Sequence, residues 1–386
     1  MSDGIARRME DIKPFQVMAL LARARELEAQ GRSIVHLEIG EPDFNTPQPI
    51  VEAGIAALRA GQVHYTPAVG LAALREAIAN WYSKGAGITV SPERIIVTPG
   101  ASGALLLAMA VLLNPGEAVL MADPGYPCNR YFARLLEGKT IGIPVTEASD
   151  YQLSSNHMDS YWTPETRVAL VASPANPTGT LLSQAGLAAL IKSVESRKGT
   201  LIVDEIYHGL VYEGRAATAL GLSDHVLVIN SFSKYFGMTG WRLGWLVVPN
   251  NFIEAAEKLA QNLFLAASTP AQYAALAAFK PETLEILEAR RVEFQQRRDF
   301  LLPGLRSLGF YVPVTPQGAF YIYANCSRFS TDSFAFAQEL LEKTGVAVTP
   351  GIDFGCNAPQ QHLRFAYTTS TEQLQEGLKR LQAYLN

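Results

Sequence analysis

Short apolar runs with the length of β-strands alternate along this chain with longer segments of helical spacing. The runs are rich in Val, Ile and Leu and lie at residues 94–98, 118–121, 168–172, 200–203, 226–229 and 244–248. Helix-like segments lie at residues 71–84, 101–113 and 183–196. Alternation of this kind predicts βα units and a mostly parallel sheet, an α/β fold. Because polar residues do not alternate within the runs, we expect helices on both faces of the sheet.

A second structural unit is predicted near the carboxyl end. A charged helical stretch over residues 281–298 is followed by shorter strand-like segments at 309–313 and 319–324. Residues 15–30 also have helical spacing, and they end at Gly31. We therefore place a large domain at about residues 46–284.

Composition excludes several classes of protein. The chain has 386 residues, of which 48% are hydrophobic, so it can bury a large core. A net charge of −4 gives no broad basic surface for nucleic acid. The longest apolar run, residues 104–113, is too short for a bilayer, which takes about 20 residues.

Cysteine and histidine usage gives further expectations. The three cysteines, Cys128, Cys326 and Cys356, lack paired spacing, which favours a reducing compartment and a cytoplasmic location. None of the six histidines has metal-ligand spacing with a cysteine or an acidic partner. We therefore expect no catalytic metal, no disulfide framework and no membrane segment.

The segment after the run at 225–230 carries reactive side chains. Lys234 should lie on the loop at the carboxyl end of this strand, where open α/β sheets bind their ligands. Ser231 and Ser233 flank it, and Arg242 follows eight positions later. One amine, hydroxyls and a guanidinium suit a cofactor with an aldehyde and a phosphate.

Two further segments supply groups for such a ligand. Gly100-Ala101-Ser102-Gly103 joins a strand to the apolar helix predicted at 104–113, so backbone N–H groups and the positive helix end can meet a phosphate. A glycine-containing turn of this kind is common by itself, but Ser231 and Arg242 favour the same anion.

Asp204 ends an apolar strand, where a carboxylate is costly to bury unless it meets a positive group. Glu205 should point elsewhere, and we interpret it as a solvated or ion-paired carboxylate. His208 is interpreted as local packing or polar support.

Six segments, in order, resemble one family over about residues 14–364. They are Glu38-Ile39-Gly40-Glu41-Pro42-Asp43, Tyr65-Thr66-Pro67 with Gly70, Gly100-Ala101-Ser102-Gly103, Asn176-Pro177-Thr178-Gly179, Asp204-Glu205-Ile206-Tyr207, and Lys234 to Arg242. The chain resembles the class I/II (fold type I) pyridoxal-phosphate-dependent aminotransferases. The resemblance implies a large domain, 46–284, with a mostly parallel seven-stranded sheet, and a smaller α/β domain formed by residues 1–45 and 285–386.

The resemblance also implies roles for single residues around pyridoxal 5'-phosphate. Lys234 would form a Schiff base with the cofactor and move the substrate proton. Asp204 would meet the pyridine nitrogen, and Tyr207 and Asn176 would donate to the phenolic oxygen. These assignments make Lys234, Asp204 and Tyr207 the catalytic residues.

Other implied contacts complete the site. Tyr126 corresponds to the aromatic residue that stacks on the cofactor ring, and Tyr65 to the residue that reaches the phosphate of a neighbouring subunit. The latter implies a homodimer with shared active sites. Arg364 falls where the family binds the substrate α-carboxylate, a task that suits a planar guanidinium. Gly40 would bring its backbone close to the same carboxylate, which Asn176 also approaches. The phosphate would be held by Ala101, Ser102, Gly103, Ser231, Ser233 and Arg242.

Three functions remain open from the sequence. The first is an aminotransferase that moves the amino group of an L-amino acid to a 2-oxo acid by a ping-pong mechanism. The second is a cysteine-S-conjugate β-lyase, which needs the same residues. The third is a non-catalytic sensor joined to a DNA-binding module, for which a match that begins near Pro14 leaves no room.

The substrate is less constrained than the reaction. Some acid-specific relatives carry a lysine where this chain has Ser102, which weakens a preference for aspartate. Phe15, Tyr65 and Tyr321 are possible pocket walls, so a neutral or aromatic amino acid is an equal alternative.

Overall fold

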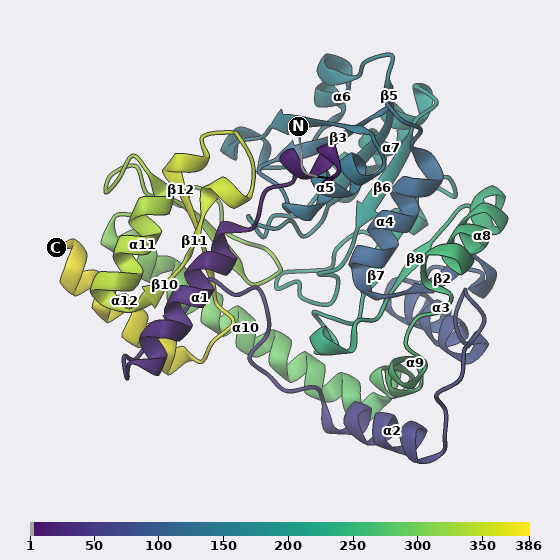
Figure 1. The fold of residues 1–386 in the computed structure, drawn as a ribbon, viewed down its shortest axis with the longest axis horizontal. Coiled ribbons are helices and arrows are strands. Elements are labelled where there is room, and N and C mark those ends of the chain that lie inside the picture. Colours follow the sequence, from purple (N-terminus) through teal and green to yellow (C-terminus); the bar gives the residue numbers. More distant parts are fainter. Residues whose placement is uncertain (1–3) are drawn as a thin grey trace.

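A seven-stranded sheet forms the centre of the larger part of the molecule (Figure 1). The computed structural model describes residues 4–386. The strand order is β2-β8-β7-β6-β5-β3-β4. Their bounds are β2 Ile95–Thr98, β3 Ala118–Asp123, β4 Lys139–Pro144, β5 Thr166–Ala172, β6 Thr200–Asp204, β7 Leu227–Ser231 and β8 Gly244–Val247.

The strand directions confirm the predicted mostly parallel sheet. Neighbouring strands from β4 to β7 run parallel, whereas β8 is antiparallel to both β7 and β2. The sequence runs identified every strand except β4. This strand lies at the sheet edge and is largely exposed, so its sequence, KTIGIP, lacks the continuous apolar character of the central strands.

Helices cover both faces of the sheet. The chain has twelve α-helices within residues 4–386: α1 Gln16–Ala29, α2 Gln48–Arg59, α3 Ala72–Ala86, α4 Gly100–Leu112, α5 Cys128–Leu135, α6 Ser155–Tyr161, α7 Gln184–Ser196, α8 Ile253–Phe264, α9 Thr269–Leu276, α10 Pro281–Leu308, α11 Ser333–Thr344 and α12 Thr371–Leu385.

The side chains of successive β6 residues belong to two different hydrophobic cores, one on each face of the sheet. Ile202 packs with residues of α4 and α8, while Leu201 and Val203 pack with residues of α3 and α7. This alternation follows from the pleat of a strand, which sends successive side chains to opposite faces. Because both faces meet helices, the strand needs apolar residues at every position.

Local side chains help to fix where several helices begin and end. Ser183 accepts a hydrogen bond from Gly186 N at the start of α7, and Asp332 accepts from Phe334 N and Ala335 N at the start of α11. Gly87 ends α3 in the left-handed conformation.

The remaining strands form two small sheets in what we call the small-sheet region. Strand β1, Val35–His36, pairs with β10, Val346–Ala347. Strands β11 (Thr349–Pro350), β12 (His362–Ala366) and β9 (Tyr321–Asn325) form an antiparallel sheet. Figure 1 shows α1 beside these strands, so segments from both chain ends meet here.

Two predictions for this region had different outcomes. The strand predicted at 319–324 is present as β9. The strand predicted at 309–313 is wrong, because that segment makes only an isolated bridge between Tyr311 and Asn325. Helix α10 continues to Leu308, ten residues beyond the predicted end at Arg298, and it connects the two parts of the molecule in Figure 1.

No helix within residues 4–386 combines the length and the apolar character required to cross a membrane.

Candidate active site

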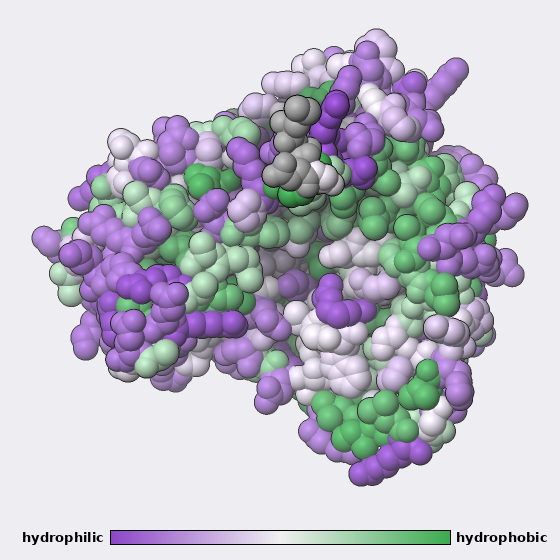
Figure 2. Space-filling view, viewed as in Figure 1, coloured by the Kyte–Doolittle hydropathy of each residue, from purple (hydrophilic) through white to green (hydrophobic). Residues whose placement is uncertain are grey.

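A cavity of about 270 Å³ lies where the carboxyl ends of β5, β6 and β7 face the small-sheet region. Figure 2 shows the surface hollowed between the part that contains α1 and the part that contains α8. Most residues that the sequence singled out line this cavity: Gly40, Ala101, Ser102, Tyr126, Asn176, Asp204, Tyr207, Ser233, Lys234, Arg242 and Arg364.

Three predicted residues do not line the cavity. Ser231 is fully buried behind Ser233, and its Oγ donates to the Leu243 carbonyl at 3.0 Å. Gly103 lies inside α4, which begins at Gly100, one residue before the predicted helix-like segment 101–113 and four before its apolar part at 104–113. Tyr65 is 82% exposed and lies away from the cavity of its own chain.

Lys234 follows the carboxyl end of β7 and points into the cavity. Its Nζ donates a 2.6 Å hydrogen bond to the Gly40 carbonyl and lies 5.7 Å from the ring centroid of Phe320. The pKa of Lys234 is lowered to about 8, chiefly by removal from bulk water and also by the charges of Arg364 and Arg242, while Glu41 and Asp204 oppose the change. A lowered pKa increases the neutral, nucleophilic fraction of the amine.

Asp204 stands at the end of β6 with only 5% of its surface exposed. Its Oδ1 accepts a hydrogen bond of 3.0 Å from Ile206 N. Burial raises the pKa of Asp204 to about 6, against that hydrogen bond and the more distant charge of Lys234. A buried carboxyl of this kind fits a ligand that brings its own cation, such as a protonated pyridine nitrogen.

Arg364 is brought to the cavity by β12. Its Nη1 donates to Asn176 Oδ1 at 3.0 Å, and its Nη2 donates to the Glu38 carbonyl at 2.7 Å. The Tyr321 ring centroid lies 4.3 Å from the guanidinium carbon. Arg364 is 6% exposed and its Nε has no partner within residues 4–386. A buried guanidinium with neutral partners only is suited to receive a carboxylate.

Tyr207 and Tyr321 place two hydroxyls at the cavity wall. Their oxygens are 2.9 Å apart, and burial raises the pKa of both phenols. Both therefore stay protonated and can donate hydrogen bonds. The Tyr321 hydroxyl also explains Gly40, since a Cβ atom at position 40 would overlap it.

A cradle for an anion lies at the start of α4. Gly100 has φ of +72°, and a Cβ atom there would lie 2.7 Å from Arg242 Nη2. The absence of a side chain therefore lets the guanidinium approach the positive end of the helix. With the cavity-lining hydroxyls of Ser102 and Ser233, this arrangement fits a phosphate dianion.

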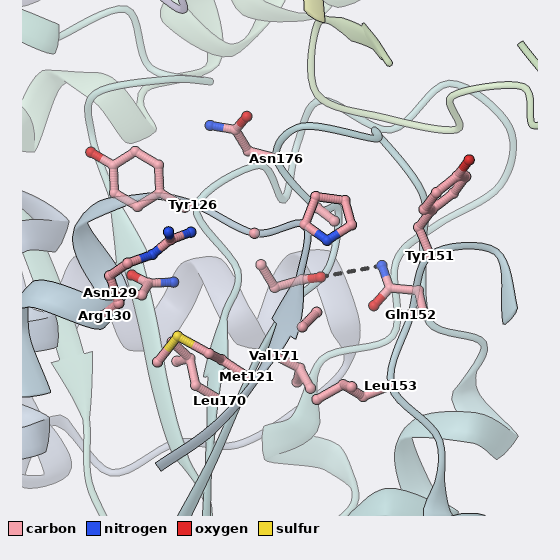
Figure 3. A pocket seen from close by; sticks show the side chains of 15 residues that line it. Met121, Tyr126, Asn129, Arg130, Tyr151, Gln152, Leu153, Leu170, Val171 and Asn176 are labelled. Carbon is pink, nitrogen blue, oxygen red and sulfur yellow. Dashed lines mark hydrogen bonds between the residues drawn. The ribbon is translucent and has the colours of Figure 1, made fainter. Parts of the chain in front are cut away.

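Tyr126 and Asn176 also border a second, smaller cavity (Figure 3). Its volume of about 30 Å³ leaves room for little more than one water molecule. Gln152, drawn in Figure 3, donates to the Ala172 carbonyl at 3.3 Å and so ties the end of β5 to a neighbouring loop. This cavity supports the main site rather than binding a second substrate.

Sequence reasoning missed residues that support the site from loops. Asp353 accepts hydrogen bonds from Gln16 N at 2.8 Å and Val17 N at 2.9 Å, and it fixes the start of α1 at the cavity. Thr349 donates to the carbonyl of Glu38. Neither residue lies in a recognisable sequence pattern, because its partners are more than 300 positions away.

Comparisons with known proteins agree with this geometry. The model of the family "Aminotransferase class I and II" matches residues 32–381. Valine--pyruvate aminotransferase of Mycobacterium tuberculosis is 38% identical, with 100% of this chain and 99% of that protein covered. (5-Formylfuran-3-yl)methyl phosphate transaminase of Methanocaldococcus jannaschii is 37% identical over 99% of this chain and 100% of its own length.

A solved structure gives the same result for the fold. The crystal structure of an aminotransferase from Mycobacterium tuberculosis superposes with a TM-score of 0.96, 38% identity and coverage of 100% of this chain and 99% of that chain. The chain therefore belongs to the class I and II aminotransferase family, with the fold type I architecture. It is an enzyme, an aminotransferase, and its relatives do not favour the β-lyase alternative.

Proposed function

We propose that this aminotransferase binds pyridoxal 5'-phosphate in the 270 Å³ cavity and runs a ping-pong cycle between an L-amino acid and a 2-oxo acid. The observation that carries the proposal is the convergence of Lys234, Asp204, Arg242 and Arg364 on one cavity from separate elements. When bound, the cofactor supplies an aldehyde for the amino group and a ring that accepts electrons.

Different residues hold different parts of such a cofactor. Arg242, Ser102, Ser233 and the backbone at Ala101 hold the phosphate, with Ser231 behind Ser233 as a support. Asp204 holds a proton on the ring nitrogen. Tyr207 and Asn176 donate to the phenolic oxygen, and Tyr126 covers the ring.

Lys234 and Arg364 act on the substrate. The guanidinium of Arg364 orients the α-carboxylate of donor and acceptor in turn, beside Asn176 and the backbone of Gly40. The Nζ atom of Lys234, with its lowered pKa, takes the proton from the α-carbon of the donor in one half-reaction and delivers a proton to the α-carbon of the acceptor in the other. Both half-reactions thus use the same groups in the same positions.

The proposal extends to the donor. On the side of α1 the cavity is lined by the apolar side chains of Phe15, Val17 and Met18, and Phe354 and the carboxyl of Asp353 line it as well. Within residues 4–386, Lys234, Arg242 and Arg364 are the lysine and arginine side chains that line it, and each has a role above. We infer that the donor has a neutral, apolar side chain; the valine in the name of the M. tuberculosis relative agrees with this inference.

We also propose a homodimer with shared active sites. Tyr65 is 82% exposed, and Leu58 and Val63 nearby in sequence are each 57% exposed. Figure 2 shows apolar surface where α2 lies in Figure 1. Such a surface supports contact with a second copy, whose cavity Tyr65 would reach.

The domain division predicted from the sequence, 46–284 against 1–45 with 285–386, is retained as a proposal. The separate sheets support it, although the boundary at 284 falls in the first turns of α10. The cytoplasmic location stays a prediction.

The test is the visible spectrum of the purified protein with pyridoxal phosphate, followed by amino acids without any oxo acid. We expect a cofactor band that shifts with certain amino acids, and no such response in Lys234→Ala. The exposed Lys192→Ala is the matched control. A wild-type protein that stays colourless, or a Lys234→Ala variant with near-normal turnover, contradicts the proposal.

A further inference from the structure

Glu205 is a completely buried acid immediately behind the active site. It follows Asp204 in the chain and has no exposed surface. Its Oε1 accepts a hydrogen bond of 2.9 Å from Ala219 N. Its Oε2 lies 3.2 Å from Nδ1 of His208 and is a buried oxygen with no hydrogen-bond partner within residues 4–386. Of the sequence-based interpretation as a solvated or ion-paired carboxylate, the solvated alternative is therefore wrong, and the basic side chain beside Glu205 is the imidazole of His208.

Within residues 4–386, no lysine or arginine is among the groups that shift the pKa of Glu205. The groups that act on it are Thr218, the backbone of Ala219 and the nearby carboxyl of Asp204. Tyr82 of α3 also lies close enough for the Glu205 charge to affect it: burial is the main cause of the raised pKa of its phenol, and the Glu205 charge raises it further. Asn230 and Trp245, which bond to Tyr82, are neutral.

Burial shifts the pKa values of Glu205 and His208 in opposite directions. It raises the pKa of Glu205 to about 8, helped by the charge of Asp204 and opposed by the hydrogen bonds from Ala219 and Thr218. It lowers the pKa of His208 to about 4, against a hydrogen bond with the Ser173 backbone. Near neutral pH both shifts favour an uncharged acid and an uncharged imidazole.

We propose that Glu205 is a protonated positioning residue, which donates from Oε2 to Nδ1 of His208 and leaves Asp204 as the only negative charge at the end of β6. The proposal rests on the proposed role of Asp204 toward the ring nitrogen. A second carboxylate one residue away would raise the pKa of Asp204 and weaken its hold on that proton. Neighbouring carboxyl groups in contrasting environments commonly take such separate roles.

The pair also fixes the loop that carries Tyr207. His208 N donates to the Glu205 carbonyl at 2.8 Å, so backbone and side chains close a short ring around residues 205–208. Ala219 is held to the same acid, which connects the far end of this loop to β6. Loss of these contacts of Glu205 with His208 and Ala219 is expected to displace Tyr207 and Asp204 together.

The experiment compares Glu205→Gln, which can donate to His208 and accept from Ala219, with Glu205→Leu, which can do neither. Infrared difference spectra of the cofactor-free protein at neutral pH should contain a protonated-carboxyl band that Glu205→Gln removes and the exposed Glu254→Gln retains. With cofactor, Glu205→Gln should keep kcat within about twofold, whereas Glu205→Leu should lose roughly tenfold or more. His208→Asn, which keeps an acceptor near the Nδ1 position, should resemble Glu205→Gln.

Each result has a defined meaning. Absence of the band in the wild type, or an ionised-carboxylate band lost in Glu205→Gln, overturns the proposal. So does a Glu205→Gln variant that is as impaired as Glu205→Leu, since a charge would then be required. If Glu205→Leu does not fold, the infrared result and the kcat of Glu205→Gln decide. Failure to bind pyridoxal phosphate at all would instead contradict the proposed function and leave the infrared result standing.

Discussion

Arg364 and Asn176 are 188 positions apart in the chain, yet Nη1 of Arg364 donates a 3.0 Å hydrogen bond to Oδ1 of Asn176. The arginine belongs to β12 of the small-sheet region, and the asparagine to the loop after β5 of the seven-stranded sheet. The proposed carboxylate site is thus assembled from both parts of the molecule. Any change in the position of one part relative to the other will alter substrate binding.

Replacement of Arg364 by Leu should therefore weaken substrate use. We expect kcat/KM for the amino donor to fall by an amount equivalent to about 2 to 5 kcal/mol, because the α-carboxylate loses its ionic partner. Arg364→Lys should recover only part of the loss, since an ammonium cannot make two parallel hydrogen bonds. Steady-state kinetics measure both, with the exposed Arg25→Leu as control. An unchanged dependence on donor concentration would remove Arg364 from the site.

Asp204 should make the cofactor-free protein sensitive to pH. Burial raises its pKa from 3.8 to about 6, so the folded state favours the protonated acid. The associated stability is present below pH 3.8 and is lost as the pH rises toward 6. The loss should reach at most about 3 kcal/mol.

Urea unfolding measured between pH 3.8 and 6 tests this predicted pH dependence of stability. Asp204→Asn, which carries no charge, should remove the contribution of this residue to the pH dependence. Added pyridoxal phosphate should stabilise the wild type more than the variant, because its ring nitrogen supplies the missing cation. Identical pH profiles of the wild type and Asp204→Asn would show that burial of this carboxyl carries no cost.

The sequence was sufficient where chemistry is concentrated in short segments. Lys234, Asp204 and the start of α4 each follow a continuous apolar run, so their place at the carboxyl ends of strands could be predicted. Glu205 could not be interpreted in this way. Its burial depends on α3 and on residues near Ala219, which no local pattern connects to β6.

The sequence also did not predict contacts between distant segments. Asp353 holds the start of α1 through backbone groups, and a backbone N–H leaves no signature in the residue type. Strand β4 was missed because an edge strand needs little apolar surface. Only the folded arrangement identifies these features.

The apolar wall near α1 predicts which donors react. We expect kcat/KM for valine, leucine or phenylalanine to exceed that for aspartate by roughly tenfold or more, because each lysine or arginine side chain that lines the cavity within residues 4–386 already has another proposed role. Ser102→Lys should increase the use of aspartate, and Ser102→Met should not. A panel of donors without oxo acid, followed by absorbance, gives the ranking. A wild-type preference for aspartate would contradict the inference.

Tyr65 allows a test of shared active sites. Tyr65→Ala and Lys234→Ala should each be strongly impaired as pure proteins. If Tyr65 completes the site of the partner subunit, mixed dimers contain one site with both defects and one intact site. Subunit exchange in an equal mixture should then restore activity to roughly a quarter of the wild-type level. A mixture no more active than its components would indicate that Tyr65 acts elsewhere.

The rate at which the protein takes up pyridoxal phosphate should depend on pH through Lys234. Only the neutral amine attacks an aldehyde, and the pKa of Lys234 is lowered from 10.5 to about 8 by its partial burial and by the nearby arginines. The second-order rate constant of reconstitution should therefore rise with pH and level off above about pH 8. Arg242→Gln removes one nearby positive charge, so the midpoint should move upward. Stopped-flow absorbance measures the rate. A midpoint near 10.5 would mean that the cavity does not perturb this lysine.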